Sequence, residues 1–237
     1  MQPWKLNSHT RTLVDMSLDK SETFIREADS RLTTCNISDS LDKCGYRDQV
    51  AFQRLVSLRP NDRIMGRART VRFEEDLNPN PENPYDDMIE FIDSVSAGEI
   101  VVIATGRSNK TAFWGELFSA AAKARGALGM ITDGNIRDTD KILAVDFPVY
   151  SISHRPLDYR GRMKVTEVQS TVTIEGVAIH PGDLLMADND GVVVITREIE
   201  DEVLSAARTR VMTESTVLSE LQAGSTLREV WDKHHVL

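Results

Sequence analysis

The sequence has little of what stabilises secreted proteins or anchors proteins in membranes. Its two cysteines, Cys35 and Cys44, form no CxxC motif, and no cysteine or histidine cluster has the spacing of a zinc site. The longest apolar run, Ile100 to Ala104, is far shorter than the roughly 20 residues that cross a bilayer. Residues 1–18 contain no apolar core of a signal peptide. We therefore predict a soluble protein of the reducing cytoplasm with no membrane partner.

Basic residues are also fewer than acidic residues. The 237 residues include 28 lysines and arginines against 37 aspartates and glutamates, which gives a formal net charge of −9. A net acidic surface repels phosphate backbones, so we expect no nucleic-acid partner. No Walker loop, GxGxxG motif or Ser-His-Asp spacing is present, so nucleotide binding and serine-hydrolase chemistry have no support in the sequence.

The N-terminal part of the chain divides into an arm and the start of a domain. Residues 1–20 are polar and aperiodic, which predicts a surface arm, and residues 21–237 predict a single domain large enough for a substantial core. Apolar residues recur at helical spacing in three segments: 21–32, 33–45 and 86–95. The second of these helices is expected to be capped by Asn36 or Ser38.

Strand and loop signals separate these helices. Residues 56–73 are strand-like, with a turn at 59–62, and residues 77–84 contain three prolines and three asparagines. These residue types exclude regular structure, so we expect an exposed loop at 77–84. The helix over 86–95 should bury the apolar side chains Met88, Ile89 and Ile92.

The middle of the chain alternates between strand-like and helix-like segments. Glu99 to Ala104 is rich in β-branched residues without polar alternation, which is typical of a strand buried on both faces. It is followed by a polar loop over 105–113, a helix over 116–125, a strand over 127–132, a helical turn over 137–143 and a strand over 147–151. This order predicts a βαβ core in an α/β fold, with ligands gathered at the carboxyl ends of the strands.

The pattern changes after Ser170. Short strand-like segments follow one another at 172–174, 177–179, 183–186 and 192–196. The turns between them, Pro181-Gly182 and Asn189-Asp190-Gly191, predict antiparallel sheet, which we expect to form a second layer against the first. Helices over 197–222 and 225–236 are expected to end the chain, so the domain has both N- and C-terminal helices.

Two glycine-bearing turns carry the candidate site. Glu116 opens a helix whose first amides, those of residues 115–118, have no acceptor within the helix and are suited to cradle an anion. Arg137 and Asp138 follow the second turn, where adjacent side chains at a helix start point in different directions. The arginine suits a bound carboxylate and the aspartate suits a cation. The structural alternative is that both acidic residues stabilise helix starts and that Arg137 forms a surface ion pair.

Glu214 is a further candidate because it lies on the apolar stripe of the long C-terminal helix, between Val211 and Leu218. A carboxylate in line with an apolar face needs a partner. A buried salt bridge, a subunit contact and a contribution to an active site across an interface are all consistent with this position. Three lysines, Lys110, Lys123 and Lys141, are conceivable Schiff-base residues, but nothing in their surroundings marks one as desolvated.

Several motifs share their spacing with a known family. Glu116 is followed by twenty residues and then by Arg137-Asp138, and similar flanking motifs occur at 66–71, 114–117, 126–129, 133–134, 147–149, 181–183 and 188–194. In these residues the sequence resembles the 4-hydroxy-4-methyl-2-oxoglutarate/4-carboxy-4-hydroxy-2-oxoadipate aldolases and their relative, the regulator of ribonuclease activity A (RraA). The resemblance extends from about Leu32 to the C-terminus.

The resemblance implies a swivelling β/β/α layered fold that assembles as a homotrimer or hexamer, with the site at a subunit interface. It also implies cleavage of a small 2-oxo acid, a 4-hydroxy-2-oxo acid, to pyruvate with a divalent metal, Mg or Mn. Many members of the family also decarboxylate oxaloacetate. One Lewis-acidic metal bound to the 2-oxo group would accept the electrons released in either reaction, so no Schiff-base lysine is needed.

The resemblance also implies a role for each candidate residue. Asp138 would be the direct metal ligand, and Arg137 would hold the pyruvyl oxygen and stabilise enolate charge. Glu116 would hold a metal-bound water or transfer a proton, and Glu214 would reach the neighbouring subunit's site as a further catalytic residue. Substrate binding is assigned to Arg137 and to the helix-start residues Gly115, Glu116, Leu117 and Phe118.

The sequence departs from the family's pattern in three places. Glu116 stands where the aldolases have aspartate, and both the 77–84 loop and the N-terminal arm look like additions. A different substrate or rate is therefore expected. Two alternatives remain: a non-catalytic regulator of the RraA type that acts by protein–protein binding, and a different lyase or hydratase on the same fold. Retention of Glu116 with Arg137 and Asp138 favours the enzyme.

Overall fold

The structure is a computed structural model that describes residues 31–51, 55–79 and 82–237. The predicted N-terminal arm, and all but the last two residues of the helix predicted over 21–32, lie outside the described residues. Every helix of the described ranges is too short or too polar to cross a membrane.

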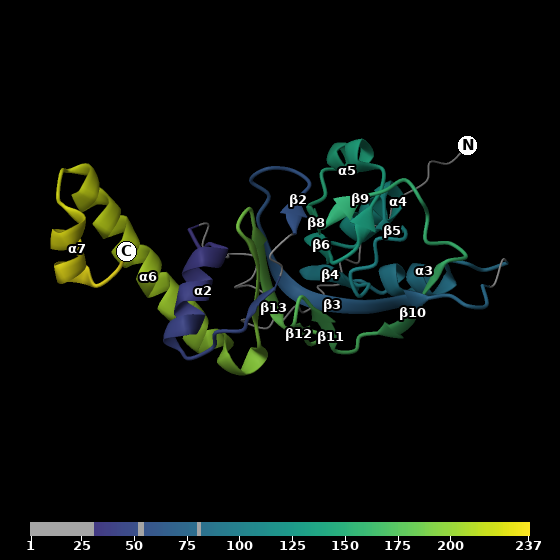
Figure 1. Cartoon of the computed structure of the whole chain (residues 1–237), viewed down its shortest axis with the longest axis horizontal. Helices are drawn as coiled ribbons and strands as arrows, with labels where there is room; N and C mark the ends of the chain where they lie inside the picture. The colour runs from purple at the N-terminus through teal and green to yellow at the C-terminus, as the bar shows by residue number, and fades with distance from the viewer. Residues whose placement is uncertain (1–30, 52–54, 80–81) are drawn as a thin grey trace, which may run out of the picture.

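Within the described residues, nine strands form a mixed sheet at the centre of the molecule (Figure 1). Their order is β1-β14-β13-β3-β4-β6-β8-β2, with β10 paired to β3 beside this path. The strands are β1 (Val50–Ala51), β2 (Val56–Ser57), β3 (Ile64–Glu75), β4 (Glu99–Ala104), β6 (Gly129–Thr132), β8 (Val149–Ser151), β10 (Met163–Val168), β13 (Leu184–Asp188) and β14 (Gly191–Ile195). The pairs β3–β4, β4–β6 and β6–β8 are parallel, which confirms the α/β core.

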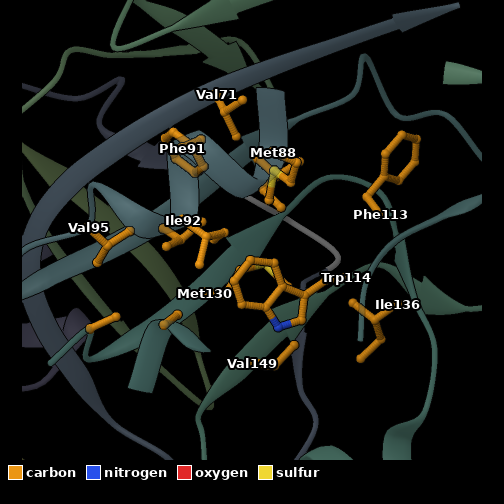
Figure 2. Close-up of a cluster of buried hydrophobic side chains, with 14 of the residues drawn as sticks. Val71, Met88, Phe91, Ile92, Val95, Phe113, Trp114, Met130, Ile136 and Val149 are labelled. Carbon is orange, nitrogen blue, oxygen red and sulfur yellow. The ribbon is translucent and has the colours of Figure 1, made fainter. Parts of the chain in front are cut away.

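Helices cover one face of the parallel strands. They are α3 (Asp86–Asp93), α4 (Glu116–Ala124) and α5 (Thr139–Val145), close to the positions predicted. Alternate residues of β4 point to opposite faces, so Val101 and Ile103 join the core under these helices and Ile100 and Val102 join the core on the other side. The strand is therefore buried on both faces, as its composition predicted. Figure 2 shows Trp114 within the first of these cores.

The prediction for the inner side of α3 was partly wrong. Met88 and Ile92 are buried, but Ile89 is 50% exposed and Phe91 is buried in its place. The buried side chains are Met88, Phe91 and Ile92, at helical positions i, i+3 and i+4, so they face the sheet together (Figure 2). Ile89 is turned away from the sheet, toward the cavity described below.

The predicted second antiparallel layer was also partly wrong. Strands β13 and β14 form a hairpin with Asp188 opposite Gly191, but β13 pairs with β3 and so extends the main sheet. A separate two-stranded sheet, β11 (Val172–Ile174) and β12 (Val177–Ile179), packs its apolar side chains against the face opposite the helices. The long strand β3 offers one edge to the parallel strands and the other to the hairpin, which sequence periodicity alone does not reveal.

The helices before and after the sheet pack together against one face of β13 and β14, and the last of them packs on the long helix, away from the sheet (Figure 1). They are α2 (Thr34–Lys43), the short 3-10 helix η1 (Arg197–Ile199), α6 (Glu200–Gln222) and α7 (Leu227–His234). The cap of α2 is Thr33 rather than Asn36 or Ser38. Thr33 accepts a bond from the Asn36 amide and the Asn36 side chain bonds back to Thr33, so Asn36 closes the capping box from inside the helix.

A small parallel sheet links the two candidate turns. Its strands are β5 (Ala112–Trp114), β7 (Asn135–Ile136) and β9 (Ser153–His154). Strand β5 occupies the end of the segment that was predicted as a polar loop over 105–113. Because these strands contain only two or three residues each, they carry too little periodicity to be predicted.

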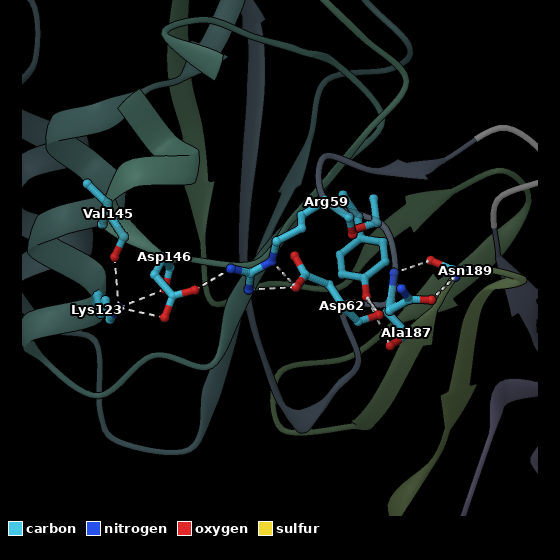
Figure 3. A network of polar contacts seen from close by, with 10 residues as sticks. Arg59, Asp62, Lys123, Val145, Asp146, Ala187 and Asn189 are labelled. Atoms are coloured by element: carbon cyan, nitrogen blue, oxygen red, sulfur yellow. Dashed lines mark hydrogen bonds and ion pairs between the residues drawn. The ribbon is translucent and has the colours of Figure 1, made fainter. Parts of the chain in front are cut away.

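A polar cluster fastens the far ends of α4 and α5 to the start of β3 (Figure 3). Arg59 pairs with both Asp62 and Asp146, and Lys123 donates to the carbonyl oxygens of Val145 and Asp146. Cations at the carboxyl end of α5 complement the partial negative charge of that helix end. We call these residues the anchor cluster.

Candidate active site

A cavity of about 510 Å³ opens where the amino-terminal ends of α4 and α5 face the start of α3. Its walls come from segments that are far apart in the sequence: residues 85–89, 112–118, 137–141 and 158–159. The cavity lies beyond the carboxyl ends of the short strands β5 and β7. This is the position at which α/β folds place their ligands.

Gly115 and Glu116 begin α4 at one side of the cavity. The first hydrogen bond of the helix runs from the Ser119 amide to the Gly115 carbonyl oxygen at 3.1 Å, so the amides of residues 116–118 precede the helical ladder. The Ser119 hydroxyl fixes this turn, because it donates to the Gly115 carbonyl at 3.0 Å and accepts from the Trp114 indole at 2.6 Å. The helix start is therefore held rigidly and presents donors suited to an anion.

Backbone pairing brings Arg137 and Asp138 to the same place. The Arg137 amide donates to the Trp114 carbonyl oxygen at 2.9 Å, next to Gly115. A Cβ atom at position 115 would lie 2.8 Å from an Asp138 carboxylate oxygen and 3.3 Å from Arg137 Cγ. Glycine at position 115 therefore leaves room for the Asp138 carboxylate and the Arg137 side chain beside this turn. The predicted trio Glu116, Arg137 and Asp138 is thus assembled in one cavity, together with the predicted binding residues Gly115, Leu117 and Phe118.

Asp138 has an unusual backbone conformation. Its φ and ψ are 58° and 38°, in the left-handed region that aspartate tolerates better than most residues. It occupies the cap position of α5, yet its carboxylate forms no capping hydrogen bond. Its contact with Arg137 Nε is 3.7 Å long. The carboxylate therefore keeps acceptor capacity on the cavity side, since Gly115 leaves that side open.

The other charged groups of the cavity form two pairs. Lys141 Nζ lies 3.2 Å from the Glu116 carboxylate, and Arg137 Nη1 lies 3.3 Å from the Asp158 carboxylate. The Tyr85 hydroxyl also donates to Asp158. Burial, followed by this hydrogen bond, raises the pKa of the Tyr85 hydroxyl, so Tyr85 stays protonated and continues to donate.

Sequence reasoning missed Asp158 and Tyr85, and it considered Lys141 only as a Schiff-base residue. Asp158 reaches the cavity because the Ala112 amide donates to the Leu157 carbonyl oxygen at 2.7 Å, a contact between loops that no local pattern announces. Tyr85 directly follows the 77–84 loop. The one sequence feature that could have identified Tyr85 as a cavity residue is its position directly after this proline-rich loop.

The rest of the cavity is apolar. Aromatic rings pack on one another along its wall, with ring centroids 5.4 Å apart for Tyr85 and Tyr159 and 5.6 Å apart for Trp114 and Phe118. At the mouth, Ile89 is 50% exposed and Leu117 is 79% exposed. The cavity therefore has a charged end at the two helix starts and an apolar end between α3 and α4.

The charged end carries a net negative charge. The lining contains two cations, Arg137 and Lys141, and three carboxylates, which are Glu116, Asp138 and Asp158. Their formal sum is −1. An anionic ligand would be opposed by this balance unless a cation entered with it.

The donor set fits one kind of metal. In the part of the chain that the structure describes, no three His, Cys, Asp or Glu side chains are grouped as ligands for a metal ion. A closed zinc site would need four protein ligands. Magnesium needs only one or two carboxylates and keeps several waters. The Asp138 carboxylate, free of a capping bond beside the open space at Gly115, meets that requirement.

Glu214 lies elsewhere. Its carboxylate accepts from the Asn36 side chain at 2.6 Å and pairs with Arg210 Nε at 2.7 Å, so it joins α6 to α2. It is absent from the cavity lining of this chain. Of the alternatives considered for this residue, a salt bridge describes its contacts within one protomer, although the pair with Arg210 is only partly buried and lies along α6.

Comparisons with known proteins identify the family of this chain. A sequence model of the family described as "RraA-like: Aldolase/RraA" matches residues 34–194. A protein of Halalkalibacterium halodurans named "Putative 4-hydroxy-4-methyl-2-oxoglutarate aldolase" is 30% identical over 185 residues, which cover 78% of this chain and 82% of that protein. The protein DlpA of Legionella pneumophila is 27% identical over 205 residues, which cover 84% of this chain. The match covers only 32% of DlpA, so the chain spans about a third of that relative's length.

A solved structure shows the same fold. It is that of RraAS2 from Streptomyces coelicolor, described as an unusual member of the RNase ES inhibitor RraA protein family. The TM-score is 0.72 at 20% identity, and the match covers 90% of this chain and 98% of that chain. At this identity the likeness establishes the layered α/β architecture with its terminal helices and carries no statement about activity.

Proposed function

This chain belongs to the RraA-like family, and we propose that it is a divalent-metal-dependent aldolase, a lyase that cleaves a 4-hydroxy-2-oxo acid to pyruvate. The observation that carries the proposal is the convergence of Glu116, Arg137 and Asp138 on one cavity, next to the helix-start amides of α4. The aldolase name of the Halalkalibacterium relative supports the same reaction class.

The metal is proposed to be magnesium or manganese, held by Asp138 with waters in the remaining positions. When bound, it supplies a Lewis acid for the 2-oxo group. Its two positive charges would turn the net −1 of the cavity lining into +1. The loaded cavity would then attract an anionic substrate, whereas the protein side chains alone would repel it.

Each side chain has a defined part in the proposed reaction. The amides at the start of α4 bind the C1 carboxylate, and Arg137 donates to the 2-oxo oxygen, where negative charge develops. Glu116 takes the proton of the C4 hydroxyl, directly or through a water. The C3–C4 bond then breaks, and its electron pair moves to C3 to form pyruvate enolate. Protonation at C3 gives pyruvate, and C4 leaves as an aldehyde or ketone.

The same arrangement supports decarboxylation of oxaloacetate. Loss of carbon dioxide from C4 leaves its electron pair on C3 and forms the same enolate. Arg137 would stabilise this charge as before, and no proton need be removed first. Oxaloacetate is therefore a simple reporter of the pyruvate-enolate end of the cavity.

The proposal includes assembly as a homotrimer or hexamer with the site at a subunit boundary. Glu214 takes part in catalysis only if a second copy of the chain brings its α6 to this cavity, because within one protomer its carboxylate is engaged by Asn36 and Arg210. A cytoplasmic location, inferred from cysteine usage, is part of the same proposal.

The first test is pyruvate release from oxaloacetate with magnesium or manganese, compared with EDTA and with a metal blank that lacks enzyme. We expect metal-dependent release above the blank. Absence of pyruvate from oxaloacetate and from a set of 4-hydroxy-2-oxo acids would overturn the proposal.

A second candidate function is a regulator that binds another protein without turnover. It is favoured by the exposed apolar residues at the cavity mouth, Ile89 and Leu117, which a protein partner could cover. This reading requires no metal and no carboxylate at position 116. Normal partner binding by an Asp138→Asn variant, in a protein that releases no pyruvate, would favour the regulator over the aldolase.

A further inference from the structure

The apolar end of the cavity has no part in the chemistry described above. We propose, as an extension that rests on the aldolase function, that the substituent at C4 of the substrate is apolar or aromatic rather than a carboxylate. The substrate would then be a monocarboxylic 4-hydroxy-2-oxo acid, and the released carbonyl product an apolar aldehyde or ketone.

Among the groups of one protomer, charge accounting favours a substrate with one carboxylate. Both cations of the lining are already paired, Arg137 with Asp158 at 3.3 Å and Lys141 with Glu116 at 3.2 Å. A divalent metal leaves a net charge of +1, which the C1 carboxylate alone neutralises. A second carboxylate would restore a negative balance, and at the apolar end it would lose its hydration with no cation beside it.

The uncharged polar groups of the wall offer no substitute. The Tyr85 hydroxyl already donates to Asp158. The Tyr159 hydroxyl is buried in the wall, with no hydrogen-bond partner among the described residues, and is not accessible from the cavity. A second carboxylate at this end would therefore meet aromatic carbon and two aliphatic side chains, Ile89 and Leu117.

The size of the cavity and the positions of its apolar side chains also support an apolar substituent at C4. A cavity of about 510 Å³ is within the usual range for a ligand larger than pyruvate. Phe118 and Leu117 follow Glu116 on the first turn of α4, so a substrate whose C1 end rests on the amides of that turn extends along these side chains. Ile89 and Tyr85 close the opposite side. Burial of an apolar substituent there removes exposed hydrocarbon from water on both partners.

Direct binding tests the inference without turnover. Two acids that lack the C4 hydroxyl, and so cannot be cleaved, differ only in the group at C4: 2-oxo-4-phenylbutanoate carries phenyl and 2-oxoglutarate carries carboxylate. Titration calorimetry with magnesium should show at least about tenfold tighter binding of the phenyl acid, from its buried apolar area and the unpaired second carboxylate of its competitor. Equal binding, tighter binding of 2-oxoglutarate or no binding of the phenyl acid would overturn the inference.

A variant at the cavity mouth links the preference to the site. Leu117→Lys places a cation at the apolar end, and we expect the ratio of the two dissociation constants to move by about tenfold toward 2-oxoglutarate. The matched control is Leu227→Lys, the same change at an exposed leucine of α7 outside the cavity. It should leave the ratio unchanged. A ratio that moves equally in both variants, or in neither, would place the preference elsewhere.

The proposed function is judged separately, by pyruvate release from oxaloacetate in the same preparations. If pyruvate is released but the phenyl acid has no advantage, the aldolase stands and the inference about C4 is wrong. If the phenyl acid binds at least tenfold more tightly but no pyruvate appears from oxaloacetate or from 4-hydroxy-2-oxo-4-phenylbutanoate, the apolar subsite stands and the aldolase is wrong.

Discussion

The helices α4 and α5 carry a charged cluster at each end, and the two clusters differ in how completely their groups are used. In the anchor cluster, Arg59 contacts Asp62 at 2.6 Å, and Lys123 donates to two carbonyl oxygens at 2.7 Å each. In the cavity, the pairs of Lys141 with Glu116, Arg137 with Asp158 and Arg137 with Asp138 measure 3.2, 3.3 and 3.7 Å.

Exposure does not explain this difference. Asp146 of the anchor cluster has 65% of its side chain exposed, whereas Asp138 of the cavity has 38%. What differs is the helix end. At the carboxyl ends, the carbonyl oxygens are satisfied by Lys123, while at the amino ends the amides remain free and the carboxylates keep acceptor capacity. Unused hydrogen-bonding capacity distinguishes a binding site from a structural ion-pair cluster.

The strongest test of this comparison replaces one aspartate at each end of α5, in separate variants, with asparagine. Asp138 and Asp146 both have left-handed backbone conformations, with φ of 58°, and asparagine tolerates that region. Asp138→Asn should lower metal-dependent kcat/KM by about 10³-fold, because the metal loses its one charged ligand. Asp146→Asn should leave kcat/KM near the wild-type value. Pyruvate release and thermal melting of both variants provide the measurement, and equal activities would refute the assignment of Asp138.

A substitution at Gly115 should have the next largest effect. In Gly115→Ala the new Cβ would meet an Asp138 oxygen and Arg137 Cγ, so the Asp138 carboxylate must turn aside and the Arg137 side chain must give way. Displacement of catalytic groups by about an ångström costs on the order of 10²-fold in rate. Steady-state kinetics with oxaloacetate would show the loss, and a circular dichroism spectrum like that of the wild type would confirm that the fold is kept. Unchanged kinetics would mean that the approach of the two turns is not required.

A smaller effect is expected from Arg137→Lys. An ammonium keeps the charge but cannot reproduce the planar fork of donors that reaches both Asp158 and the substrate oxygen, so kcat/KM should fall by about 10- to 100-fold. The matched control is Arg155→Lys, an exposed arginine outside the cavity. If both variants retain wild-type kinetics, Arg137 does not hold the substrate oxygen.

The smallest expected effect is on the pH dependence of thermal stability, through Asp146 of the anchor cluster. The hydrogen bond from Arg59, and then the charges of Arg59 and Lys123, lower the pKa of Asp146 below its ordinary value. Folding therefore gains stability from ionised Asp146 above its unfolded pKa of about 4, and this gain disappears as the pH falls through the lower folded value. The wild type should melt slightly above Asp146→Asn at pH 7, and the two curves should converge in acid. A constant difference from pH 7 to pH 3 would contradict this account.

The sequence predicted the parts of the fold whose signal is local and long. The unbroken β-branched run of β4 and the helices α3, α4, α5 and α6 were all placed within a few residues of their observed positions. It could not place β13 and β14 in the main sheet, because edge pairing with β3 depends on the shape of the whole sheet. The orientation of Ile89 was missed because a short amphipathic helix can bury either of two neighbouring apolar positions.

For the site, spacing and resemblance brought together the residues that lie on consecutive turns. Strands β5 and β7 pair directly, so the turns that follow them lie side by side. This is why the sequence motif could predict that Glu116, Arg137 and Asp138 share one site. Asp158 and Tyr85 enter from loops that are distant in sequence, so their positions follow only from tertiary contacts. Glu214 was predicted to need a partner for its carboxylate, and the structure supplies Asn36 and Arg210, while its catalytic role stays a prediction.

The origin of the apolar wall has a consequence for how this protein family can diversify. Tyr85 and Ile89 belong to α3 and its preceding loop, whereas Glu116, Arg137 and Asp138 belong to the turns after β5 and β7. An insertion or deletion in the 77–84 loop can therefore alter one wall of the cavity while leaving the other wall in place. Under the proposed function, a change of substrate would then require no change in the segments that carry Glu116, Arg137 and Asp138.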